Sequence, residues 1–350
     1  MNLEIQGMRD SGYFLEIVHA GMVKAGLNVN AIYERLGYNA EDLPLREMRT
    51  PHQLQAYFWE TVEAVTGDAE IGLHLCRHMP VFHGEVLEYL IFSSATLGEG
   101  VERALKYLRL LSDALNVRIV NDTQGARALV KGTAADAPQL RHTEICVVYE
   151  LIQFLKSVTE QKFVPQHVAL HCSQRASQAE YDSTFGCPVT FGAAESEIWF
   201  DPSILEYRSP RWDPDLLKLH EDLAERRLSK LRRHDLIEKI QKLFAQRLEL
   251  DQLTLEDVAE ELGVPTRRLR FELSRAGTSF SELLSDFRFA LAKRLLASTD
   301  EPIENIVYLT GFSEPSTFYR AFKRWSSMTP VQYREQRRAH RRLARASATR

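Results

Sequence analysis

The sequence is poor in cysteine and lacks any long run of apolar residues. Its 350 residues include only four cysteines, Cys76, Cys146, Cys172 and Cys187. They lie far apart and form no C-x-x-C pair, so we expect reduced, structural thiols rather than a disulfide framework or a zinc ribbon. The best apolar run, 145–149, ends at a glutamate, so no membrane span is expected. The N-terminus shows no basic region followed by an apolar one, which predicts no signal peptide and a cytoplasmic protein.

Motifs for nucleotide binding and hydrolysis are also missing. The sequence contains no G-x-G-x-x-G, no P-loop and no G-x-S-x-G. Histidines and cysteines gather at 74–83 and 167–172, but no carboxylate is placed as in H-E-x-x-H. We interpret these residues as core or surface side chains, and we expect no cofactor and no bound metal.

The composition is that of a globular protein with unevenly distributed charge. Hydrophobic residues make up 44% and charged residues 26%, which excludes disorder as the main state. The length suits two or three domains. The net charge of −4 combines +4 in residues 251–350, with 17 Lys and Arg against 13 Asp and Glu, and −8 in residues 1–250, with 27 against 35. The basic excess indicates an anionic partner for the C-terminal part.

Residues 1–205 are predicted to form an α+β domain. Apolar side chains recur at helical spacing over much of 11–120. Two runs of strand type flank a short polar loop near residue 123 and predict a hairpin. The segments expected to follow are a helix at 140–159, a strand at 167–171, a helix near 176–185, and strands at 189–191 and 198–200. This mixture is typical of the α+β class.

Residues 206–249 are predicted to be a linker and a connecting helix. Leucines recur at helical spacing from about 215, and residues 226–247 hold eight basic and two acidic residues. We interpret this charge as a solvated helix face rather than a DNA contact. The last segment, 336–350, has many arginines without apolar periodicity and is predicted to be a disordered tail.

Residues 250–335 contain a degenerate internal repeat, and each copy has the helix-turn-helix layout. In the first copy, Thr254 and Asp257 fit a capping box. Gly263 follows where the helix must stop, and a second helix begins near Thr266. The region is therefore predicted to be an all-α double helix-turn-helix.

The second copy repeats this pattern 48 to 49 residues later. Thr299 or Asp300 is expected to cap a helix with Pro302 in its first turn, and Gly311 makes the turn. A helix over 279–297 separates the copies and is roughly 28 Å long at ~1.5 Å per residue. Successive major-groove faces of DNA lie ~34 Å apart, so the two second helices could enter adjacent turns.

The second copy also carries a family resemblance. Residues 311–325 read GFSEPSTFYRAFKRW and residues 328–334 read MTPVQYR. This pattern is close to the signature of the C-terminal DNA-binding domain of the AraC/XylS family of bacterial transcriptional regulators. The earlier residues are similar, less specifically, to the arabinose-binding-type N-terminal domain of one branch, through LSDAL at 111–115 and FGCPVTFG at 185–192.

The resemblance implies a sequence-specific DNA-binding transcriptional regulator. It implies an activator that responds to a small-molecule effector, whose identity the sequence does not give. The implied partners are double-stranded promoter DNA and RNA polymerase, with a homodimer as the assembly and no membrane contact. The dimer is expected to form outside 251–335, because one chain already supplies both recognition helices.

Helical geometry selects the residues expected to face DNA. In the second module, Arg320 can bind guanine bidentately and Ser316 can bond to base edges, whereas Lys323 is better placed for phosphates. The full predicted set is Thr266, Arg267, Arg270, Phe271, Pro315, Ser316, Tyr319, Arg320, Lys323 and Arg324. Phe271 and Glu272 depart from the polar or basic residues that the family commonly has there, and Glu272 repels phosphate.

A rival hypothesis treats residues 1–205 as a catalytic domain that the helix-turn-helix region tethers to DNA. No nucleophile–base pair and no metal-ligand set in that region supports it. A third hypothesis, in which the helices only dock another protein, is weakened by Arg320 and by the paired modules.

Overall fold

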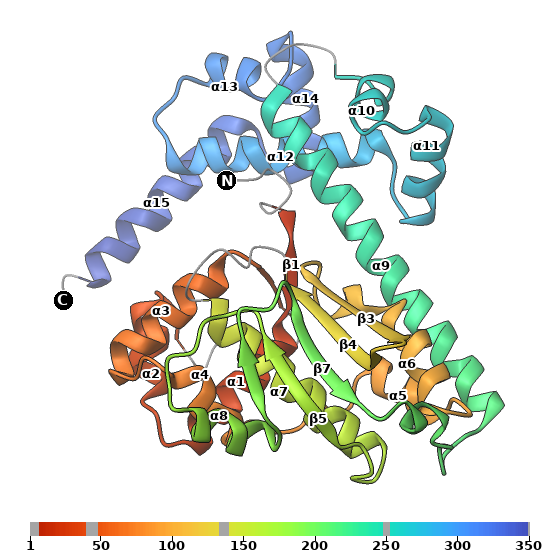
Figure 1. Cartoon of the computed structure of the whole chain (residues 1–350). Helices are drawn as coiled ribbons and strands as arrows, with labels where there is room; N and C mark the ends of the chain where they lie inside the picture. Colours follow the sequence, from red (N-terminus) through yellow and green to blue (C-terminus); the bar gives the residue numbers. More distant parts are fainter. Residues whose placement is uncertain (1–6, 40–47, 133–139, 248–252, 349–350) are drawn as a thin grey trace. The chain divides into compact units, whose positions relative to one another are not determined.

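Figure 1 shows the computed structural model, which describes residues 7–39, 48–132, 140–247 and 253–348. The chain divides into two units, Met1–Leu228 and Ser229–Arg350. The division falls inside one continuous helix, α9 (Pro214–Arg247). The helix predicted from about residue 215 is thus present, and its two halves belong to different units.

The first unit is built on a five-stranded sheet. Its order is β3 (Leu115–Asp122), β4 (Gly125–Gly132), β7 (Ser196–Phe200), β5 (Pro165–Leu170), β6 (Val189–Phe191). All pairs are antiparallel except β5 with β6. The predicted hairpin is confirmed: Asp122 lies opposite Gly125, whose φ of +130° suits a glycine in the tight connection.

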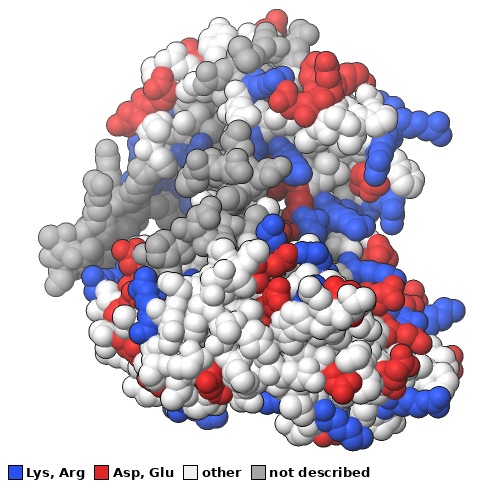
Figure 2. Space-filling model, viewed as in Figure 1, with Lys and Arg blue, Asp and Glu red and all other residues white. Residues whose placement is uncertain are grey.

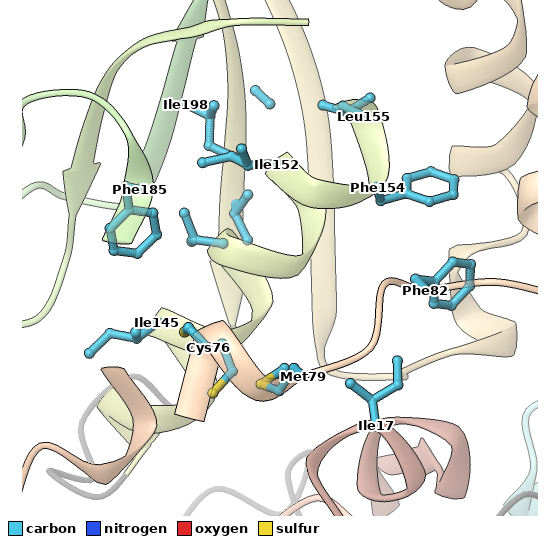
Figure 3. Packing of buried hydrophobic residues seen from close by; sticks show 14 of the residues in the cluster. Ile17, Cys76, Met79, Phe82, Ile145, Ile152, Phe154, Leu155, Phe185 and Ile198 are labelled. Atoms are coloured by element: carbon cyan, nitrogen blue, oxygen red, sulfur yellow. The ribbon is translucent and has the colours of Figure 1, made fainter. Parts of the chain in front are cut away.

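Helix α7 (Leu140–Val158) forms the centre of this unit. It contacts β5 and β7 of the sheet as well as α3 (Leu54–Thr66) and α4 (Ile71–Leu75), which gives three layers. Figure 3 shows Ile152 of α7 beside Ile198 of β7. The other helices are α1 (Gly12–Lys24), α2 (Val29–Arg35), α5 (Val86–Phe92), α6 (Leu97–Leu105) and α8 (Gln178–Phe185). Together with the sheet they confirm the predicted α+β class.

A small second sheet was not predicted from the sequence. Strands β1 (Arg9–Ser11) and β2 (Arg49–Pro51) pair antiparallel in a region expected to be helical. Asp10 is 2% exposed, and its carboxylate accepts a hydrogen bond from Ser112 Oγ at 2.6 Å and lies 2.9 Å from His52 Nδ1. Three-residue strands are too short to show alternation, and these long-range polar contacts leave no periodic signal.

The second unit contains the two predicted helix-turn-helix modules. Its helices are α10 (Leu255–Glu261), α11 (Thr266–Arg275), α12 (Phe280–Ser298), α13 (Ile303–Leu309), α14 (Pro315–Ser326) and α15 (Pro330–Ala348). Figure 1 shows α10 and α11 near one end of α12. Each module has its own apolar cluster: α12 gives Leu283 to the first and Ala292 and Leu296 to the second. Helix α12, the helix expected over 279–297, thus contributes to the cores of both modules.

Two expectations about helix ends in this unit are wrong. Thr299, expected with Asp300 as an N-cap of the next helix, is instead the C-cap of α12: its backbone is extended and its Oγ1 donates to the Leu295 carbonyl at 2.7 Å. The N-cap of α13 is Pro302, which was expected in the first turn of that helix. The chain after residue 336, expected to be disordered, continues α15 to Ala348. Arginine and alanine are strong helix formers, so this helix needs no apolar stripe over its last turns. Near its start, Arg334 Nη2 donates to the Glu301 carbonyl at 2.6 Å.

The predicted capping box of α10 is present and gives a first testable prediction. The Asp257 amide donates to Thr254 Oγ1 at 3.1 Å, and the Thr254 amide donates to Asp257 Oδ2 at 2.8 Å. Thr254→Ala removes the first bond and should lower the free energy of unfolding by about 1 kcal/mol in urea titrations of the full chain. Ser281→Ala, at an exposed position of α12, is the matched control and should change it little. Equal effects of both substitutions would contradict the role of the cap.

Candidate DNA interface and ligand cavity

Helix α11 turns its predicted DNA-facing residues away from the core of the first module. Leu269 and Leu273 are each 1% exposed, whereas the Phe271 side chain is 59% exposed. Helical spacing places the polar face opposite these leucines. Gly263, with φ of +65°, makes the turn that sets α11 against α10. Of the predicted residues of α11, Arg267, Arg270 and Phe271 are exposed, whereas Thr266, three residues before Leu269, is half-buried and differs from its predicted exposure.

Helix α14 repeats this arrangement in the second module. Pro315 occupies its first turn, and Phe318 and Phe322 are fully buried. Tyr319 differs from its predicted exposure: it is half-buried and packs on the core of the second module, with its ring centroid 6.0 Å from that of Phe318. The predicted residues of α14 that are exposed are Pro315, Ser316, Arg320, Lys323 and Arg324.

The basic groups on these two helices are available to an anion. Arg320 lies along its own helix, where Nε donates to the Ser316 carbonyl at 3.3 Å and Nη2 to Thr317 Oγ1 at 3.5 Å. Among the described residues, no carboxylate lies within ion-pair distance of Arg267, Arg320, Lys323 or Arg324. Arg270 has only a 4.0 Å contact with Glu256, and both side chains are exposed. Figure 2 shows basic side chains over α11.

The two modules are not chemically equivalent. Leu269 and Phe318 occupy matching inward positions 49 residues apart, and the same offset pairs Phe271 with Arg320. Where the second module has Arg320, which can bind guanine, the first module therefore has the aromatic ring of Phe271. The Arg275 guanidinium carbon lies 5.8 Å from the centre of the Phe271 ring. An arginine at this position can hydrogen-bond to base edges, whereas a phenylalanine can make only apolar contacts, such as that with a thymine methyl.

The first unit contains a cavity that the sequence did not reveal. Its volume is about 640 Å³, which is in the range of small-molecule sites. The lining comes from segments far apart in the sequence, including α1, α2, α3 and α7, so no local motif marks it. The aromatic side chains on its wall include Phe14, Tyr33, Tyr57, Phe58 and Trp59.

Most acidic groups on the cavity wall already have protein partners. Glu144 Oε1 accepts hydrogen bonds from the His171 amide and from Ser196 Oγ, both at 2.6 Å. Asp10 is bonded to Ser112 and His52, as described above. Glu150 differs, because neither of its carboxyl oxygens has a hydrogen-bond partner among the described residues.

His74, in the first histidine and cysteine group noted in the sequence, has two carboxylate partners. His74 Nδ1 lies 2.6 Å from Asp68, and Nε2 lies 3.3 Å from Glu180. Partial burial opposes the charged form, but these two carboxylates raise the pKa of His74 overall. The described part of the chain holds no group of three or more side chains able to bind a metal ion. It also holds no helix that is long and apolar enough to cross a membrane.

Comparisons with known proteins establish the family. Residues 26–209 match the family described as "Arabinose-binding domain of AraC transcription regulator, N-term", which is more than half of the chain. Residues 258–336 match a family described as "Helix-turn-helix domain". The chain belongs to the AraC family of transcription regulators. The predicted function of a DNA-binding transcriptional regulator is thereby confirmed, and its first unit is the effector-binding type of domain.

Relatives of this AraC-family regulator include proteins that match over most of its length. It is 29% identical over 279 residues to the ornithine utilization regulator of Pseudomonas aeruginosa, covering 79% of this chain and 81% of that protein. It is 26% identical over 316 residues to the regulator VirS of Mycobacterium tuberculosis, covering 84% and 91%. Over 84 residues it is 38% identical to the urease operon transcriptional activator of Escherichia coli, covering 24% and 28%.

Proposed function

We propose that this regulator activates transcription in response to a small molecule. In this proposal α11 and α14 bind double-stranded promoter DNA through the ten residues named above, and the cavity of the first unit binds the effector. The observation that carries it is the joint presence, on both recognition helices, of basic groups without an ion pair among the described residues, and of a largely apolar cavity of about 640 Å³ in the first unit. The proposal places its action at the nucleoid, in the cytoplasm, because its partner is chromosomal DNA.

The activator role and a contact with RNA polymerase belong to the proposal. The urease operon relative, an activator by name, supports it for the DNA-binding part. Genome-wide mapping of the DNA sites bound by the full chain should find them beside promoters. Transcription from those promoters with purified RNA polymerase should then rise when the protein is added. Unchanged or reduced transcription at every mapped promoter would contradict the activator role.

We also propose that the protein is a homodimer, formed outside residues 251–335. The first unit leaves three large apolar side chains exposed at helical spacing near the start of α9: Trp212 at 57%, Leu216 at 45% and Leu219 at 60%. A second copy would cover this stripe and would bring four recognition helices to tandem or inverted sites, which raises apparent affinity through effective concentration.

Light scattering tests this assembly. The full chain should have the mass of a dimer at micromolar concentration, and Leu219→Lys should shift it toward the monomer, because a charge would be buried in the interface. Val164→Lys is the control, since Val164 is 64% exposed but lies away from α9 in the sequence. A wild-type monomer, with and without DNA, would contradict the proposal.

A further inference from the structure

Glu150 is the one carboxyl group on the cavity wall that combines deep burial with the lack of a partner among the described residues. It lies on α7, it is 7% exposed, and it lines the cavity together with Ile17, Met79 and Cys146, which are all buried. The backbone amide of Phe82 is close enough to lower the pKa of this carboxyl group slightly, but its geometry falls short of a hydrogen bond, so neither oxygen has a partner among the described residues. Buried polar groups in folded proteins nearly always have a hydrogen-bond partner. The carboxyl group of Glu150 can therefore pair with a polar or charged group of a ligand.

Among the residues that the structure describes, none supplies a cation to this position. Arg141 also lines the cavity, but its Nη1 donates to Glu70 at 2.6 Å and its Nη2 lies 3.2 Å from Glu63. Lys131 and Arg175 line the cavity too, with exposed side chains that do not bond to Glu150. An ionised carboxylate in such surroundings is costly unless a cation pairs with it.

We propose that Glu150 anchors a protonated amine of the effector, whose remaining body is mainly apolar. This inference rests on the proposed function, in which the cavity binds the effector. Three observations favour a cation over a neutral or anionic ligand: the unpaired acid itself, the aromatic side chains of the wall, whose faces attract cations, and the net charge of −8 over residues 1–250.

Binding of an amine at Glu150 should release a proton. Burial raises the pKa of Glu150 to about 8, and the nearby Phe82 backbone offsets this only in part. At pH 7 the empty cavity therefore holds mostly the neutral acid. A bound ammonium group stabilises the ionised carboxylate of Glu150. The carboxyl proton is then released to solvent, and a carboxylate–ammonium pair remains. The affinity for amines should rise with pH up to about 8.

Two other ionisable groups near Glu150 keep their protons in this range. Burial raises the pKa of Cys76 well above its usual value and that of Tyr149 to about 12, so both stay neutral. Farther along the wall, His52 Nδ1 faces Asp10, and His171 Nδ1 donates to the Ala193 carbonyl at 2.8 Å. Both histidines are unchanged in a Glu150→Gln variant. If that variant binds the amine without releasing a proton, the proton released by the wild-type protein comes from Glu150.

Calorimetric titration of the full chain with three matched probes tests the inference. The probes are 2-phenylethylamine, 2-phenylethanol and 3-phenylpropionate, titrated at pH 7 in two buffers with different ionisation enthalpies. We expect the amine to bind at least tenfold more tightly than the alcohol and to release close to one proton. Glu150→Gln should abolish both effects and leave alcohol binding unchanged. Glu102→Gln, at an exposed site on α6, is the control and should retain both.

Each contrary outcome has a distinct meaning. Equal or tighter binding of the alcohol or the acid to the wild-type protein would overturn the role of Glu150 and leave the effector cavity in place. Amine preference that persists in Glu150→Gln would overturn it too. If none of the three probes bound, both this inference and the proposed effector site would fail. The wild-type comparison of amine and alcohol stands whether or not the variant folds.

Discussion

Arg320→Ala is expected to relax the choice of base at one position of the DNA site, by about 1–3 kcal/mol. Arg320 is exposed on α14, and the hydrogen bonds that its guanidinium makes to described residues go to the Ser316 carbonyl and Thr317 on its own helix. It can therefore swing toward the O6 and N7 atoms of a guanine without breaking an ion pair. Selection of binding sites from a random DNA pool, with the full chain, measures the preference at each position.

Lys323→Ala is the matched comparison for Arg320→Ala. Lys323 is exposed one turn further along α14 and forms no ion pair with the described residues. If it binds phosphate, its loss should weaken binding to all sequences alike and lower the salt slope by about one. An altered base preference in Lys323→Ala, or an unaltered one in Arg320→Ala, would show that the assignment of reading and positioning residues is wrong.

The DNA-binding unit could be predicted closely because its signals are local. Thr254, Gly263 and Gly311 mark helix ends within a few residues of themselves, and the stripe that contains Phe318 and Phe322 repeats at helical spacing. Tyr319 shows the limit of this reasoning. Spacing placed it on the outer face, but packing against the module core half-buries it.

The first unit could be predicted less fully, because its decisive contacts join distant residues. The hairpin of β3 and β4 followed from adjacent alternating runs. The β1–β2 sheet joins Asp10 to Thr50, and no pattern spans that distance. Glu150 sits in a helix that the sequence does predict, but its isolation depends on residues such as Ile17 and Met79, more than sixty positions away. Burial of a charge in a cavity is a property of tertiary structure alone.

The fully buried Phe322 is expected to be the most important residue for the stability of the second module. Its ring centroid lies 5.6 Å from that of Phe289 on α12, 5.8 Å from that of Phe318, and 5.6 Å from that of Tyr333 on α15. Phe322→Ala leaves a void where three helices meet, so the loss should reach about 3–5 kcal/mol. The first module has a separate apolar cluster, built around Leu269 and α9, and should keep its fold.

Hydrogen exchange of the full chain distinguishes the two modules in this experiment. In Phe322→Ala, amides of α13 and α14 should exchange faster by two or more orders of magnitude, whereas α10 and α11 should keep their protection. Phe271→Ala is the control, because that ring is 59% exposed and its removal should change stability by less than about 0.5 kcal/mol. Loss of protection in both modules together would mean that α12 couples them into one cooperative unit, despite their separate cores. A regulator with independently stable modules could place α11 and α14 on DNA in separate steps, so this outcome also determines how the two recognition helices engage their site.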